Sequence, residues 1–123
     1  MIAERIISAL EVFNKENPTT ALLISFDAED VRAQAAASTQ RFEEGKPISI
    51  LDGVFMTIKD YIDCYPYPSN GATTWFHEVR PVKKDSVSVS KVRNCGVILI
   101  GKAKLKFFVD DEVLLQCCMY QNH

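Results

Sequence analysis

Apolar residues recur at helical spacing through the first sixteen positions of the chain. The apolar set is Ile2, Ile6, Ala9, Leu10 and Phe13, and the polar set that alternates with it is Glu4, Arg5, Ser8 and Glu11. Residues three or four apart share one side of a helix, so this pattern predicts an amphipathic helix. Asn17-Pro18 should end it, because proline cannot continue the backbone hydrogen-bond ladder.

A second helix is predicted after the short apolar run 21–26, which is typical of a strand or an extended entry. Asp27 is placed to cap the helix, and Glu29 and Asp30 suit its first turn. The helix should reach about Glu44 and stop at 45–47, where a glycine and a proline follow. Its expected apolar stripe is Val31, Ala35, Ala36 and Phe42.

The middle of the chain changes to a period of two. In the run 54–59, alternation predicts a strand with Val54, Met56 and Ile58 on one face and Phe55, Thr57 and Lys59 on the other. A long loop rich in turn formers follows over 60–81, a length that favours a functional role.

A helix capped by Asp85, with Val87, Val89 and Val92 inside, is predicted next, and then a strand over 97–100. The order strand, loop, helix, strand predicts a right-handed crossover into a partly parallel sheet. The fold class is therefore α/β, with a mixed sheet and flanking helices.

Composition narrows the function classes. The 123 residues carry a net charge of -2 and are 47% hydrophobic, which fits a single domain and lacks the basic excess of a nucleic-acid binder. We find no apolar run long enough to cross a membrane and no signal peptide, and the four cysteines show no disulfide framework. A cytoplasmic location is the default expectation.

Lys59 is the residue with the sharpest chemical interest. A lysine at the end of an apolar strand is either a surface amine or a desolvated one, and desolvation can turn it into a neutral base. Such a base can activate a serine, as in the Ser-Lys variant of the catalytic triad. The pattern alone favours the surface amine.

Other polar clusters carry weaker signals. Asp60 and Asp63 could act as an acid-base pair, but carboxylates three apart in a turn more often cap a helix or bind backbone amides. The alternation of Lys102, Lys104 and Lys106 favours a solvated strand edge.

Metal and phosphate sites are not indicated. The cysteines 64, 95, 117 and 118 form no Cys-x-x-Cys pair, and neither histidine, at 77 or 123, stands at zinc spacing from them. Gly101-Lys102 lacks the upstream glycine and the following serine or threonine of a phosphate loop.

The run from Gly45 through Leu51-Asp52-Gly53 to the strand end Lys59-Asp60 resembles the opening of the amidase signature family. The resemblance continues through 71–74, 85–96 and the strand 97–103, and the segment 63–80 is most similar to the plant fatty acid amide hydrolase branch. It implies a Ser-cisSer-Lys hydrolase that cleaves carboxamides such as fatty acid amides or N-acylethanolamines without a cofactor. The family's catalytic lysine falls on Lys59, and the resemblance makes membrane association an option beside the cytoplasmic default.

The chain departs from the family pattern after Ala103. No glycine- and serine-rich segment with the family's two catalytic serines follows, and Ser86, Ser88 and Ser90 match neither position. We therefore expect residues 1–103 to be the N-terminal part of an amidase signature domain and 104–123 a divergent tail. The chain should be inactive alone. The alternative is a non-catalytic binding module that forms a homo-oligomer or associates with a full-length amidase through its open sheet edge and apolar faces.

Overall fold

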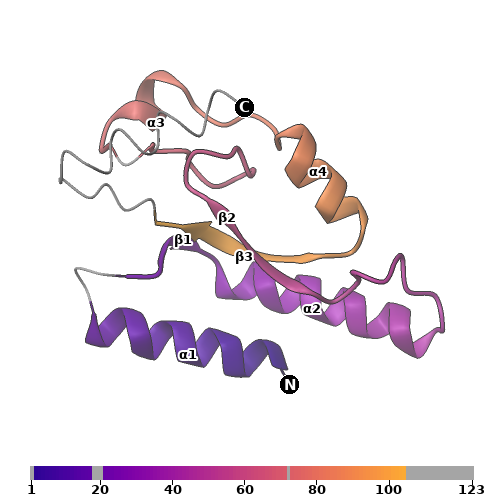
Figure 1. The fold of residues 1–123 in the computed structure, drawn as a ribbon. Helices are drawn as coiled ribbons and strands as arrows, with labels where there is room; N and C mark the ends of the chain where they lie inside the picture. The colour runs from indigo at the N-terminus through magenta and orange to yellow at the C-terminus, as the bar shows by residue number, and fades with distance from the viewer. Residues whose placement is uncertain (1, 18–20, 72, 105–123) are drawn as a thin grey trace, which may run out of the picture.

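A computed structural model of the protein describes residues 2–17, 21–71 and 73–104. The expected tail at 104–123 therefore lies outside the described residues except for Lys104. Within these ranges, three strands form one sheet, with helices on both sides (Figure 1). The elements in chain order are α1 (Ile2–Glu16), β1 (Leu23–Phe26), α2 (Ala28–Glu43), β2 (Phe55–Lys59), α3 (Phe76–Val79), α4 (Val87–Asn94) and β3 (Ile98–Ala103).

The sheet is mixed, as the sequence predicts. Its order is β1-β3-β2, with β3 parallel to β2 and antiparallel to β1. The parallel register pairs Met56 with Leu99 and then Thr57 with Gly101, so Ile100 is an extra residue on β3. Such a β-bulge exchanges the faces to which the following side chains point. β3 is also longer than expected, because its pairing with both neighbours continues to Ala103.

The helices α1 and α2 cover one face of the sheet (Figure 1). Both helices are confirmed, but the buried stripe of α1 is rotated from the expected one: Ala3 and Ile7 are buried, whereas Ile2 is 70% exposed. Where α1 meets α2, Arg32 Nε donates to Glu4 Oε1 at 2.8 Å. The core on this face consists of Ala3, Ile7, Leu23, Val31, Ala35, Ile98 and Ile100.

The helix α2 begins as expected, since the Asp27 side chain accepts hydrogen bonds from the backbone of Glu29 and Asp30. Its stripe differs from the expected one: Ala36 and Phe42 are exposed, and Ser38 is buried in their place. Ser38 is tolerated there because its Oγ donates to Asp52 Oδ1 at 2.8 Å. Burying a hydroxyl costs little free energy when it donates to a charged acceptor. The hydrophobic pattern of the sequence cannot reveal such a buried polar residue.

The other face of the sheet packs against α4 and the loop that follows β2 (Figure 1). Ile58, Cys64, Val89, Val97 and Leu99 form its buried core. The expected cap of α4 was wrong by one residue: Ser86 accepts from the Val89 backbone, while Asp85 pairs with Arg93 at 2.8 Å. Val87, expected inside, is exposed to solvent.

None of the helices in the described ranges is both long and apolar enough to cross a membrane.

Candidate active site

Lys59 is the last residue of β2, at the edge where the parallel strands β2 and β3 end together. It pairs in register with Ala103, and the Asp60 amide donates to the Ala103 carbonyl at 3.1 Å. The next turn is closed by the Ile62 amide, which donates to the Lys59 carbonyl at 3.0 Å. Ligands of open α/β sheets bind outside the carboxyl ends of the strands, and Lys59 lies at that position.

The side chain of Lys59 is exposed, which agrees with the surface amine that the pattern alone favours and not with the desolvated alternative. Within the part of the chain that the structure describes, Lys59 Nζ makes no hydrogen bond or ion pair, and no serine hydroxyl contacts it. Alternation along β2 places Lys59 on the face opposite Ile58, and at this last position of the strand its side chain is exposed.

The two carboxylates after Lys59 have structural partners rather than an acid-base arrangement. Asp60 is buried, and its Oδ1 accepts from the Asn70 amide at 2.9 Å, as the backbone-binding interpretation expects. Asp63 forms a bidentate ion pair with Arg80, with N–O distances of 2.9 and 2.7 Å, and also accepts a hydrogen bond from Ser69 Oγ. The Arg80 hydrogen bonds lower the pKa of Asp63 to about 2.

Lys102 corrects the expectation of a solvated lysine edge. β3 is the central strand, and Lys102 has no exposed surface at all. Its Nζ donates to the Ile62 carbonyl at 2.5 Å and to Ser69 Oγ at 3.0 Å. Burial lowers the pKa of Lys102, and the nearby Asp60 carboxylate opposes that shift. Lys104 is exposed, and Lys106 lies outside the described residues.

Ser69 and Lys102 are within the distance of a Ser-Lys pair, but their arrangement does not suit catalysis. Ser69 donates its own proton to Asp63 Oδ1 at 2.8 Å and accepts from Lys102, so the lysine acts as a donor and not as a base. Both side chains are also inaccessible, with Ser69 1% exposed. A substrate has no route to either group.

The serines of the α4 segment are not arranged as a site either. Ser86 caps the helix, its Oγ lies 3.2 Å from Ser88 Oγ, and Ser90 is exposed. The described residues also contain no group of three histidine, cysteine, aspartate or glutamate side chains that could hold a metal ion.

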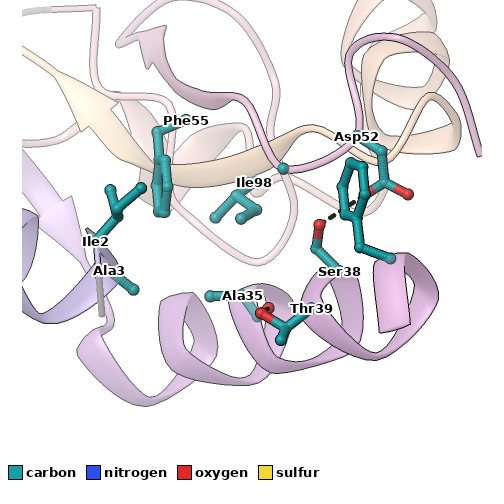
Figure 2. A pocket seen from close by; sticks show the side chains of 10 residues that line it. Ile2, Ala3, Ala35, Ser38, Thr39, Asp52, Phe55 and Ile98 are labelled. Carbon is teal, nitrogen blue, oxygen red and sulfur yellow. Dashed lines mark hydrogen bonds between the residues drawn. The ribbon is translucent and has the colours of Figure 1, made fainter. Parts of the chain in front are cut away.

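A cavity of about 320 Å³ lies on the side of the sheet away from α4, between α1, α2 and the start of β2 (Figure 2). Its walls are mainly apolar, and its one charged group, Asp52, is already bound by Arg41 at 2.7 Å. Figure 2 shows Asp52 directed toward Ser38 at the end of the cavity. The cavity therefore has no reactive group directed into it and does not include Lys59.

Comparison with known proteins decides the family. The family model described as Amidase matches residues 4–110. The chain belongs to the amidase family. Its sheet and helices also match the peptide amidase of Stenotrophomonas maltophilia with a TM-score of 0.73 at 20% identity, over 84% of this chain and 20% of that one. A likeness at that identity shows the shared fold.

Sequence relatives narrow the likeness within the amidase family. The chain is 62% identical over 108 residues to a fatty acid amide hydrolase of Medicago truncatula and 61% identical over 104 residues to that of Arabidopsis thaliana. These matches cover 88% and 85% of this chain but 18% and 17% of the relatives. The fatty acid amide hydrolase of Oryza sativa subsp. japonica is 53% identical over 105 residues, which are 85% of this chain and 17% of that relative. The chain thus spans less than a fifth of the fatty acid amide hydrolases that it matches.

Proposed function

We propose that this chain carries the catalytic lysine, Lys59, of a Ser-cisSer-Lys hydrolase for fatty acid amides and N-acylethanolamines. The supporting observation is the position of Lys59, at the carboxyl end of a strand parallel to β3, in a chain 62% identical to a fatty acid amide hydrolase. The strand fixes the backbone of Lys59, and the side chain extends away from the core, free to meet a segment packed on that edge.

In the proposed reaction, a serine hydroxyl attacks the amide carbonyl carbon, and its proton passes through the bridging serine to Nζ of Lys59. The C–N bond then breaks, and Nζ returns the proton to the leaving amine. Water hydrolyses the acyl-enzyme and releases the carboxylic acid.

A graft into a relative tests the role of Lys59. Residues 4–103 of this chain replace the aligned segment of the Medicago truncatula enzyme, and hydrolysis of a fatty acid amide is measured. We expect the graft to be active and Lys59→Ala to lower kcat by at least about 10³-fold, because loss of a triad member leaves only residual catalysis. The control, Lys91→Ala, changes an exposed lysine on α4. An inactive but folded graft, or full activity in Lys59→Ala, contradicts the proposal.

We propose further that the polypeptide of 123 residues is inactive by itself. Lys59 has no serine partner among the described residues, and the described serines that carry hydrogen bonds serve the fold. Purified protein incubated with a fluorophosphonate probe should remain unlabelled. Covalent labelling of any serine, located by peptide mass spectrometry, would contradict this expectation.

The alternative function is a non-catalytic binding module that associates with a full-length amidase or with itself. The observation in its favour is the apolar loop before β2, where Ile50 is 98% exposed and Ile48 53% exposed. Size-exclusion chromatography with and without the Medicago truncatula enzyme separates the two ideas. Co-elution, or a dimer that Ile50→Ser dissociates, supports the binding module, and a monomer in both runs counts against it.

A further inference from the structure

The most unusual residue outside the proposed reaction is Lys102, because a lysine without any exposed surface is rare. The buried ammonium needs acceptors, and the two that it has within the described ranges come from the loop after β2: the Ile62 carbonyl and Ser69 Oγ. Lys102 therefore joins the central strand to the segment 60–70 of that loop at two points, Ile62 and Ser69.

The β-bulge on β3 makes this contact. Ile98 and Ile100 point to α1 and α2, and strict alternation would send Lys102 to the same face. The extra residue pairs Lys102 with Ile58 instead, whose side chain lies among the loop and α4. Gly101 permits the close approach of β1 at this point, since a Cβ there would collide with the Ser25 carbonyl oxygen.

The contacts continue beyond the ammonium. Ser69 Oγ donates a hydrogen bond to Asp63 Oδ1, and Asp63 accepts two more from the guanidinium of Arg80. The two ends of the segment 60–70 are joined to each other, because Asp60 Oδ1 accepts a hydrogen bond from the Asn70 amide. The loop from 60 to 70 is thus held by charged hydrogen bonds at several points, and the side chain of Lys102 anchors it to the central strand.

This anchor lies one turn from Lys59. The Ile62 residue whose carbonyl binds Lys102 uses its amide to hold the carbonyl of Lys59, and Ala103, the neighbour of Lys102, accepts from the Asp60 amide. We propose that Lys102 is a positioning residue, which fixes the turn after β2 and thereby the direction in which Lys59 leaves the sheet. Lys102 cannot touch substrate itself because it is fully enclosed.

The inference rests on the proposed role of Lys59, and its test is made in the same graft. Lys102→Met keeps the length of the side chain and removes its three donors. We expect kcat to fall about 10²-fold, the typical effect of a catalytic group displaced by an ångström. KM should change less than about threefold, because the variant does not touch the substrate.

Two controls separate positioning from loss of stability. Val31→Ala creates a void on the opposite face of the sheet and should lower the melting temperature of the graft. Measured at a temperature where both variants are folded, its kcat should equal that of the parent graft. Ser69→Ala removes one of the two acceptors of Lys102, together with the hydrogen bond that Ser69 donates to Asp63, and it keeps the Ile62 acceptor, so it should fold even if Lys102→Met does not. It should lower kcat about tenfold, the worth of one hydrogen bond.

Hydrogen exchange on the chain of 123 residues provides a readout that needs no activity. Lys102→Met should speed exchange at the Ile62 and Asn70 amides about tenfold and leave α1 and α2 unchanged. Unchanged exchange in the loop, or a Lys102→Met graft as active as its parent, overturns the inference. An inactive parent graft instead contradicts the proposed function, and the exchange experiment still decides on the anchor.

Discussion

Asp52 and Asp63 each pair with an arginine, but their surroundings differ. Asp52 is enclosed and accepts four hydrogen bonds, two from Arg41 at 2.7 Å and one each from Ser38 and the Ile48 amide. These partners hold the pKa of Asp52 well below its usual range. Asp63 is partly open to solvent, and the guanidinium of Arg80 is about half exposed. Asp63 should therefore contribute less to stability than its geometry suggests.

The pKa of Asp63 predicts a specific loss of stability in acid. Its pKa of about 2 in the folded protein lies below the ordinary 3.8, so its contribution is complete above about pH 4 and disappears as the pH falls through about 2. Allowing for solvent screening, we expect this contribution to be about 1 kcal/mol. Urea unfolding of the wild type and Asp63→Asn measures it: the two should differ at about pH 5 and converge at about pH 2. A difference that persists in acid would contradict the assignment.

At the scale of the elements, the sequence predicts the existence of helices and strands well because periodicity and caps are local. Asp27, for example, caps α2 as expected. Which side of the sheet a single side chain points to is harder to predict. Lys102 was expected on a solvated edge, since no local signal shows that β3 is central or that a bulge reverses its faces. Lys59 could be placed at its strand end from sequence, but its exposure depends on which segments pack nearby.

The contact between β1 and β3 predicts a large effect of one methyl group. In Gly101→Ala the new Cβ would meet the Ser25 carbonyl and the Phe26 side chain, so the strands must separate. We expect the free energy of unfolding to fall by about 2–3 kcal/mol, as in other overpacked sites. Gly45→Ala is the control, because its Cβ would meet no atom and only the positive φ of 68° is unfavourable. Chemical denaturation compares the two, and equal losses would contradict the close approach.

At the scale of the whole molecule, one thin sheet separates two buried clusters. One contains Val31 and lies against α1 and α2, and the other contains Val89 and lies against α4. Both clusters contain residues of the same strand β3: Ile98 and Ile100 lie on one side, and Leu99 lies on the other beside Val97, which directly precedes the strand. The clusters should therefore unfold together.

Val31→Ala and Val89→Ala test this cooperativity. Each should cost about 2 kcal/mol, and the double variant should lose the sum within about 0.5 kcal/mol, since the sites lie on opposite faces and share no contact. Fluorescence and circular dichroism should report one coincident transition for all three variants. Two separate transitions would show that the faces fold independently.

The bulge at Ile100 acts as a half-period phase shift in the pattern of β3. Before it, odd-numbered residues belong to the α4 side, and after it the even-numbered Lys102 does. Deleting a single residue there would restore strict alternation and turn the ammonium of Lys102 toward the apolar residues beneath α2. The central strand can thus accommodate Lys102 because one extra residue in β3 directs this side chain to the polar loop and not to the apolar core.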